Sequence, residues 1–382
     1  MRLTGLLRPL RETEAYQALV NSLRNSRGET YLPLPPAALP YLSACLQKDL
    51  EVPVVIITAR PDRARQIHEE LAAWLDGPDR AFLFPEPDAL PYETASMDSP
   101  SQYQRMAALL ALINYHRELV SGNEKGGAPG LMGQITPVPL VIAPAHALMQ
   151  QVLSPADLSS GTQVIEAGGR LDLASLLARW VDLGFEHVHA VERHGTFSRR
   201  GGILDVFPPI SRLPVRLELY GDHVESLRYF DPLTQRSIEQ IEQAVVSPAR
   251  EAPRDGPPAA LLDYLPEGAL LVIEEPSSIQ IAVEAIDQQA QELRSQRIQE
   301  GELGAAAPHP YFDWGQLAGK LADWPRRLAA SPWADEADPG LAFRAPSFYG
   351  GRLSLLLQKV RDAQAVGAIV VIASHQAGRL AD

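Results

Sequence analysis

RHGTFSRRGGILDVFPPISRLPVRLELYGDHVESLRYFDPLTQRS, residues 193–237, contains three short runs of strand-forming residues. Prolines separate the first run from the second. Gly221-Asp222 separates the second from the third, and a glycine at the first central position favours a type II′ hairpin turn. In the second run, apolar side chains alternate with Arg216, Glu218 and Tyr220, which indicates one buried face and one polar face. The three runs, which together predict a small sheet, are Ile203–Phe207, Val215–Tyr220 and Val224–Phe230.

The same stretch carries no catalytic arrangement. Its residues include no acid–base pair, metal-ligand set or activated nucleophile at the spacing that such chemistry needs. Arg193, Arg199 and Arg200 stand beside carboxylates and aromatic side chains, and Gly201 and Gly202 allow the backbone to bend directly afterwards. The sheet is therefore predicted to be a docking surface and not a reaction centre.

Two motifs in this stretch resemble the UvrA-binding domain that the repair protein UvrB shares with the bacterial transcription-repair coupling factors. The first motif is RHGTFSRRGGILDVFPP, and the second is the strand–turn–strand that follows it. The likeness extends to LPYETASMDSPSQYQRMAALLAL (90–112) and PLVIAPAHALMQQVL (139–153). The second motif closes with residues that are more similar to the coupling factors than to UvrB: Asp231, Thr234, Gln235 and Arg236.

This resemblance implies that UvrA is a protein partner and that Arg200 is central to the contact, because both families have an arginine at this place. Arginine suits the role, since its planar fork can form paired hydrogen bonds with a carboxylate. Ser198 stands where UvrB has a second arginine. Phe207 is expected in the domain core. The further candidates for the contact are Arg193, Arg199, Phe197 and Glu218.

Length, charge and cysteine content narrow the class of protein. The 382 residues predict two or three domains, and the net charge of −13 argues against a protein that binds nucleic acid over its whole surface. The single cysteine, Cys45, rules out an internal disulfide framework and is typical of a reducing cytosol, so a cytoplasmic protein is expected. The opening MRLTGLLRPL does not read as a signal peptide, and no apolar run is long enough to span a bilayer, which predicts no membrane contact.

The rest of the chain predicts an α/β fold that the small sheet domain interrupts. Val52–Thr58 is a continuous apolar run, typical of a parallel strand buried on both faces, and a helix and a short strand follow it. After the sheet domain, the sequence again predicts an apolar strand followed by a helix, at Ala269–Ile273 and Ser277–Gln299. The fold class is therefore a degenerate helicase-like parallel sheet domain of P-loop NTPase type, interrupted by a small α+β domain of UvrA-binding type.

The predicted domain boundaries follow from changes in composition. They are 1–153 and 250–335 for the two parts of the α/β domain, 154–249 for the UvrA-binding-like domain, and 346–382 for the start of a further α/β domain. We also expect a glycine-rich surface loop at 122–137, a linker at 332–346 and a last strand at 368–373. One strand cannot complete a sheet, so the chain is expected to be part of a longer protein.

The nucleotide motifs of a helicase are degraded in this sequence. The phosphate-binding pattern G-x-x-x-x-G-K-[ST] is absent, and LPLPPAALPYL (32–42) stands in its expected place, where prolines lack the N–H donors of a phosphate cradle. Glu274 and Glu275, after the apolar run, stand at the place of the second helicase signature, and they are predicted to be solvent-facing acids without a nucleotide role. We therefore predict no catalytic residue and no cofactor.

A metal site at the histidines of the sheet domain is the weaker of two interpretations. His187, His189 and His194 lie close together in sequence, but a metal site would also need convergent geometry and supporting hydrogen bonds. Ordinary polar positions on a strand explain them better, so no metal is predicted.

The resemblance implies a recruitment module that brings UvrA, and with it nucleotide excision repair, to stalled RNA polymerase. The full protein would be an ATP-dependent DNA translocase, whose contacts to RNA polymerase and duplex DNA lie in parts that this sequence does not include. Two alternatives stay open. One is a fragment of a UvrB-type ATP-dependent repair enzyme, which the missing phosphate loop disfavours, and the other is a free-standing adaptor without a motor.

Overall fold

The computed structural model describes residues 3–25, 27–75, 77, 80–93, 100–121, 138–251 and 258–332, followed by residues 341, 343, 349, 352–368 and 370–371. The chain divides into two compact units, residues 1–341 and 342–382. The described helix of the second unit is α11 (Leu353–Ala365). The predicted loop at 122–137 lies outside the described residues, as do most residues of the predicted linker 332–346 and of the predicted strand 368–373.

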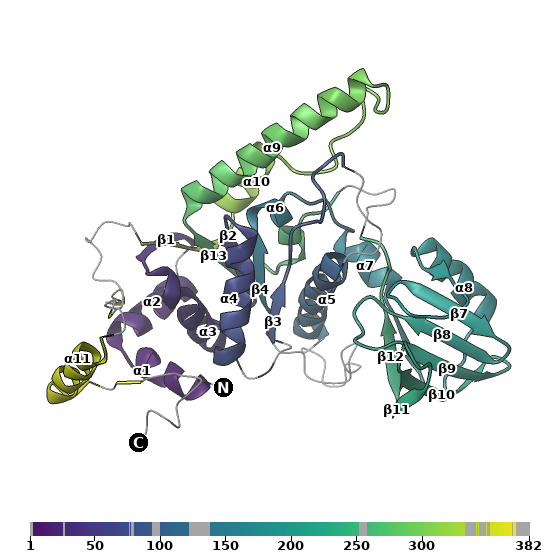
Figure 1. The fold of residues 1–382 in the computed structure, drawn as a ribbon, viewed down its shortest axis with the longest axis horizontal. Helices are drawn as coiled ribbons and strands as arrows, with labels where there is room; N and C mark the ends of the chain where they lie inside the picture. The colour runs from purple at the N-terminus through teal and green to yellow at the C-terminus, as the bar shows by residue number, and fades with distance from the viewer. Residues whose placement is uncertain are drawn as a thin grey trace. The chain divides into compact units, whose positions relative to one another are not determined.

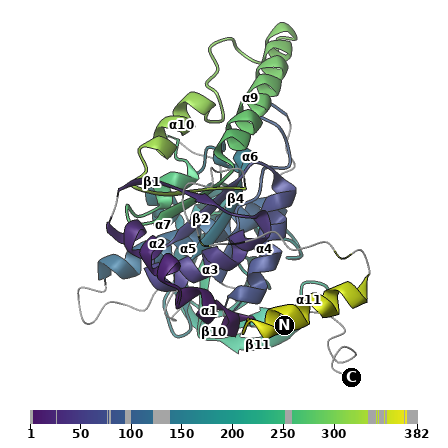
Figure 2. The same ribbon diagram turned by 90° about the vertical axis from the view of Figure 1, so that its left-hand side faces the viewer.

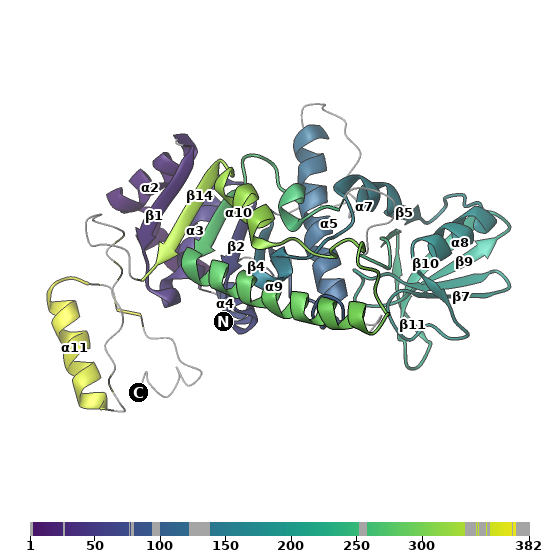
Figure 3. The same ribbon diagram turned by 90° about the horizontal axis from the view of Figure 1, so that it is seen from above.

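Six parallel strands form the centre of the first unit. In sheet order they are β1 (Gly28–Pro33), β14 (Arg326–Ser331), β13 (Leu270–Glu274), β2 (Val54–Thr58), β4 (Leu140–Pro144) and β3 (Ala81–Leu83). β2 and β4 are buried along their whole length, which explains why their sequences are continuous apolar runs. β13 and β14 follow the inserted domain in the chain but pair between β1 and β2, so the two parts of the chain build one sheet (Figure 3).

Helices cover both faces of this sheet. α4 (Pro61–Trp74) packs along β2, β3 and β4, and α3 (Leu39–Leu50) packs against α4. The opposite face carries side chains such as Val55 and Val141, which pack in one core with α5 (Pro100–Ser121), α9 (Pro276–Gln299) and α10 (Trp314–Ala322). α9 and α10 lie side by side, and α9 extends well beyond the sheet (Figures 1 and 2). The other helices of this body are α1 (Leu7–Arg11), α2 (Glu14–Asn25), α6 (Ala145–Leu148) and α7 (Pro155–Gly161).

The inserted domain is a second, mostly antiparallel sheet with one helix. Its strand order is β11-β10-β9-β8-β7-β6, and β5 and β12 form a separate antiparallel pair. The helix is α8 (Leu173–Asp182), whose Asp172 side chain caps it by accepting from the N–H groups of residues 174 and 175. The strands are β5 (Gln163–Glu166), β6 (Glu186–His187), β7 (Thr196–Arg200), β8 (Ile203–Phe207), β9 (Val215–Tyr220), β10 (His223–Phe230), β11 (Ser237–Ile241) and β12 (Gln243–Val246).

The three predicted strand runs are confirmed as β8, β9 and β10, and so is the two-residue turn between β9 and β10. Gly221 has φ of 63° whereas Asp222 does not have a positive φ, which agrees with the predicted type II′ turn. A second two-residue turn, Gly201-Gly202, joins β7 to β8, and Gly201 has φ of 60°. A Cβ at Gly202 would lie 2.7 Å from the carbonyl oxygen of Leu219, so a larger residue would push β9 away from this turn.

The core of the inserted domain lies between α8 and one face of its sheet. Trp180 of α8 is fully buried and packs with side chains from β7, β8, β9 and β10. Val215 and Leu217 of β9 belong to this core, whereas Tyr220 is 78% exposed, so the predicted alternation of β9 is confirmed. The polar face of the sheet is thus the face that points away from α8.

Candidate protein-docking site

Arg200 lies on the polar face of the inserted sheet. The antiparallel register places it opposite Ile203, which in turn pairs with Glu218, so these three side chains form one row across β7, β8 and β9. The neighbouring row, which contains Leu204 and Leu217, packs under α8, and successive residues of a strand point to opposite faces. The Arg200 row therefore faces away from α8. Ile203 is 38% exposed within it.

A single backbone carbonyl holds the Arg200 side chain. Its Nη2 donates to the carbonyl oxygen of His189 at 3.2 Å, and the Ser198 hydroxyl donates to the same oxygen at 3.0 Å. Arg200 is exposed as a residue, and its guanidinium makes this one hydrogen bond to the described part of the chain. A guanidinium that is anchored at one nitrogen and open elsewhere can still make paired hydrogen bonds to a carboxylate of a partner.

The structure separates the other predicted contact residues. Arg199 is exposed but pairs with Leu204, so it lies on the α8 face and not beside Arg200. Arg193 is 45% exposed, and its Nη2 lies 2.5 Å from the Glu186 carboxylate, an ion pair at the β6 edge. The predicted cluster of three arginines is therefore not one surface patch.

Phe197 was predicted as a contact residue, but the structure places it in the core. It is 3% exposed, and its ring packs edge-on against Trp180 at a centroid distance of 5.7 Å. An aromatic side chain on the α8 face of a central strand is buried by the helix that covers it. In this structure, Phe197 is thus part of the domain core and offers almost no surface to a partner.

Glu218 lies in the Arg200 row and already has partners inside the domain. The Ser226 hydroxyl donates to its Oε2 at 2.6 Å, and Arg228 Nη2 lies 3.5 Å from the same oxygen. The Glu218 side chain is 38% exposed. It can thus offer an acceptor to a partner, although its orientation is set by its own sheet.

Two residues on this face were missing from the predicted contact set, namely Arg216 and Tyr220. Arg216 forms a two-pronged pair with Asp205 (2.7 and 2.9 Å), which is 2% exposed, and its guanidinium carbon lies 4.6 Å from the centre of the Phe230 ring. The hydrogen bond with Asp205 raises the pKa of Arg216. Tyr220 follows Glu218 by two residues and so shares its face. The alternation of apolar and polar residues in β9 had already placed both residues on the polar face, so the sequence contained the pattern that could have identified them.

An arginine also closes the sheet edge where a nucleotide would bind. Glu274, at the carboxyl end of β13, is 11% exposed, and its Oε1 accepts from Arg63 Nε at 2.9 Å. Arg63 Nη2 donates to the carbonyl oxygen of Pro36, in the segment that replaces the phosphate loop, at 2.6 Å. The prediction of a solvent-facing acid is thus wrong for Glu274, because α4 supplies a counter-charge and covers it. Burial raises the pKa of Glu274.

Glu275 has a different role at the same edge. It precedes α9 with a φ of 50°, a left-handed conformation that is uncommon outside glycine. The Ser278 hydroxyl donates to its Oε2 at 3.0 Å. Its side chain thus contacts the first turn of α9 instead of converging with Glu274 on one ligand position.

The three histidines of the inserted domain lie in different surroundings. His187 and His189 are exposed, whereas the His194 ring stacks on Phe207 (3.9 Å) and Tyr103 (4.3 Å). Desolvation lowers the pKa of His194. Within the described residues, no group of three or more His, Cys, Asp or Glu side chains is placed to hold a metal ion. Nor does the described part of the chain contain a helix with the length and hydropathy to cross a bilayer.

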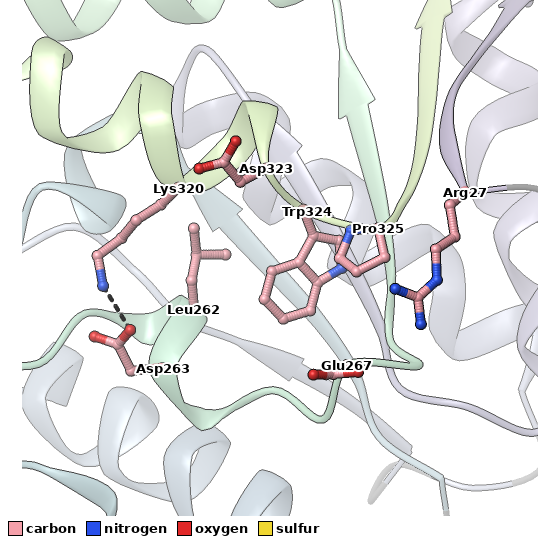
Figure 4. A pocket seen from close by; sticks show the side chains of 8 residues that line it. All are labelled: Arg27, Leu262, Asp263, Glu267, Lys320, Asp323, Trp324 and Pro325. Carbon is pink, nitrogen blue, oxygen red and sulfur yellow. Dashed lines mark hydrogen bonds and ion pairs between the residues drawn. The ribbon is translucent and has the colours of Figure 1, made fainter.

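Figure 4 shows a shallow pocket of about 270 Å³. Its residues Arg27, Glu267 and Pro325 precede β1, β13 and β14, so it lies at the amino ends of these strands, whereas Glu274 is at the carboxyl end of β13. Lys320 pairs with Asp263 at 2.5 Å on its wall, and Trp324 Nε1 donates to the Ala269 carbonyl oxygen. These interactions are internal to the fold. The pocket is lined by Arg27, Leu262, Asp263, Glu267, Lys320, Asp323, Trp324 and Pro325.

Comparisons with known proteins support the resemblance that the motifs suggested. Residues 164–251 match the family model of the UvrB interaction domain. The chain is 31% identical over 241 residues to a transcription-repair-coupling factor of Myxococcus xanthus. The aligned region covers 62% of this chain and 18% of that protein. For the proteins of the same name, identity is 30% over 203 residues in Escherichia coli K12 and 28% over 245 residues in Bacillus subtilis 168. The alignment with the Escherichia coli protein covers 53% of this chain and 16% of that protein. The alignment with the Bacillus subtilis protein covers 63% of this chain and 19% of that protein.

The chain spans less than a fifth of the length of these relatives in the aligned regions. The matched domain coincides with the inserted sheet, β5 to β12, that carries the Arg200 row. The chain is therefore similar to the N-terminal, UvrB-like region of transcription-repair-coupling factors, and its residues 164–251 match the UvrB interaction domain.

Proposed function

We propose that this chain is a recruitment module that binds UvrA through the polar face of its inserted sheet. The observation that carries the proposal is the match of residues 164–251 to the UvrB interaction domain, together with the exposed Arg200 on that face. Arginine is enriched among the residues that dominate protein interfaces, and a desolvated arginine–carboxylate pair gives both affinity and orientation. Tyr220 adds an exposed aromatic surface to the same face.

In the longer protein, this module would bring nucleotide excision repair to stalled RNA polymerase. The motor that moves on duplex DNA and the surface that binds RNA polymerase would lie in other parts of that protein. The UvrA-binding face would be covered in the resting protein and exposed when repair is needed. The domain boundaries 154–249 for the UvrA-binding part, and 1–153 with 250–335 for the α/β part, belong to the same proposal.

The α/β domain of this chain has no catalytic role in this proposal. The Arg63–Glu274 pair supports this view, because the acid that would hold a magnesium ion is already neutralised by a side chain of α4. The segment at Pro36 contributes a carbonyl oxygen to Arg63 instead of N–H groups to a phosphate. A UvrB-type repair enzyme, the alternative, would need this edge open for ATP.

Competition tests the proposal. UvrA should bind the chain, and excess UvrB should displace it, because the two proteins would present the same domain to one surface of UvrA. Immobilised UvrA can be titrated with the chain in the absence and presence of UvrB, with a UvrB that lacks its interaction domain as the control. Simultaneous binding of the chain and intact UvrB to one UvrA site would contradict the proposal, as would the absence of UvrA binding.

A further inference from the structure

One helix of the α/β body joins it to the inserted domain. α5 lies on the side of the body that faces the inserted domain (Figure 1), and polar side chains in its first two turns make these contacts. Gln102 Nε2 donates to the carbonyl oxygen of Ala249 at 3.0 Å, and Arg105 Nε donates to Glu251 Oε2 at 2.7 Å. Ala249 and Glu251 lie where the chain leaves the inserted domain, just after β12. α5 therefore holds the exit from the inserted domain at two points.

The same helix also contacts the segment that leads into β7. The Tyr103 hydroxyl donates to the carbonyl oxygen of His194 at 3.2 Å, and the two rings stack at 4.3 Å. The His194 ring also lies against the Phe207 ring of β8, at a centroid distance of 3.9 Å. β7 begins two residues after His194 and ends at Arg200. A shift of this contact would thus move the strand that presents the docking face.

The Arg105–Glu251 pair is the most buried of these contacts. The Arg105 side chain is 11% exposed and that of Glu251 is 8% exposed, and Arg105 Nη2 lies 2.6 Å from the Glu251 carboxylate. Arg105 Nη1 and Glu251 Oε1 have no hydrogen-bond partner among the described residues, so each charge depends on the other. Burial raises the pKa of Glu251. A buried charge that loses its partner is strongly unfavourable, whereas two apolar side chains of similar size can replace the pair.

A few described side chains make the apolar contacts that accompany these polar ones, among them the stacked rings of Tyr103, His194 and Phe207. The body and the inserted domain have separate hydrophobic cores, and Ile210, between β8 and β9, is the partly buried side chain of the sheet domain that packs on the body's core. At the root of the domain, the entering and leaving segments are in close contact, because a Cβ at Gly161 would lie 2.7 Å from Pro248 Cγ. The root is thus narrow, and the orientation of the domain depends on the α5 contacts.

We propose that the Arg105–Glu251 pair is a clasp that fixes the orientation of the inserted domain, and with it the Arg200 face, on the α/β body. Loss of one charge opens the clasp, because the remaining charge would be buried without a partner. It becomes hydrated when the inserted domain moves away from α5. Replacement of both charges by leucine keeps it closed. This proposal goes beyond UvrA binding and does not depend on it, since it concerns the geometry of the free chain.

Distances between two spin labels test the clasp in the full chain. Glu69 on α4 and Glu225 on β10 are exposed and can be changed to cysteine for labelling, whereas the native Cys45 is fully buried. The parent chain should give a single narrow distance distribution. Arg105→Leu and Glu251→Leu should each lose that single peak and give a broad or second population. The double variant Arg105→Leu/Glu251→Leu should recover the narrow peak.

Folding of each variant is checked by near-ultraviolet circular dichroism. If the single leucine variants do not fold, Arg105→Gln and Glu251→Gln provide the test, because each keeps a polar side chain at its position and removes one of the two charges. Broadening in those variants supports the clasp. A parent-like distribution in every folded single variant would overturn it, and so would a double variant as broad as the single ones.

Discussion

Arg63 and Arg200 show how one residue type serves two regions of this molecule in different ways. Arg63 lies at the carboxyl end of the parallel sheet, where a helicase would bind its nucleotide, and we call this end the nucleotide edge. Arg63 donates to the buried Glu274 carboxylate and to the Pro36 carbonyl oxygen, and its side chain is 15% exposed. Arg200, on the inserted sheet, donates to one carbonyl and is exposed. The first charge is satisfied inside the fold, and the second is available to a partner. Burial and hydrogen-bond partners, and not proximity to a recognisable motif, distinguish an arginine that serves the fold from one that is free to meet a partner.

The largest effect on stability is expected at Arg63. Arg63→Ala should lower the free energy of unfolding by about 3–5 kcal/mol, because Glu274 would remain buried without its partner. Arg65→Ala on the same helix is the matched control, since the Arg65–Glu86 pair has a 52% exposed arginine and exposed pairs contribute roughly 0–1 kcal/mol. Urea unfolding of both variants measures the difference. Equal losses in the two variants would contradict a buried structural pair at Glu274.

The burial of Glu274 can also be tested by measuring the free energy of unfolding at several pH values, where we expect a smaller effect than that of Arg63→Ala. The pKa of Glu274 is raised above its ordinary value of 4.5, so the folded chain binds this proton more tightly than the unfolded chain does. Glu274 therefore makes stability fall as pH rises from about 4.5 through the folded pKa. Glu274→Gln should remove this part of the pH dependence. The difference between the two unfolding curves isolates Glu274 from the other carboxylates, and a steeper fall in the variant would have the wrong sign.

The fold was predictable where the signal is local. The alternation of β9, the glycine turn before β10 and the continuous apolar run of β2 each predict their own strand, and the structure confirms them. β7 was not among the strand runs that the sequence predicted. Had its alternation been followed, Arg199 and Arg200 would have been assigned to opposite faces.

The remaining site features depend on contacts between distant residues. Arg63 and Glu274 are separated by 211 positions, and Arg105 and Glu251 by 146, so no local pattern indicates either pair. The burial of Phe197 was also not predictable from its own segment, because its ring packs against Trp180 of α8, an element that comes earlier in the chain. The sequence suggested an arginine for the docking contact, which stays a prediction, and it did not indicate which neighbouring residues share the face of Arg200.

The nucleotide edge should show no response to ATP. Because Arg63 occupies the Glu274 carboxylate, neither magnesium nor phosphate has the ligands that a P-loop site supplies. A fluorescent ATP analogue with magnesium should show no saturable binding in the micromolar range to the chain. Saturable binding that Glu274→Ala with Glu275→Ala abolishes would mean that this edge still functions as a nucleotide site.

The most direct measurement of the central claim compares Arg200→Glu with Arg199→Glu, adjacent residues of one strand on opposite faces of the sheet. Calorimetric titration of UvrA should show that Arg200→Glu weakens binding by about 30-fold or more, since the partner carboxylate would meet a like charge. Arg199→Glu should change the affinity by less than about threefold, because its side chain faces away from the docking surface. Thermal melts of both variants provide the folding control. If Arg200→Glu is folded and binds UvrA as tightly as the parent chain, or if Arg199→Glu weakens binding equally, the assignment of the polar face as the UvrA-binding surface is wrong.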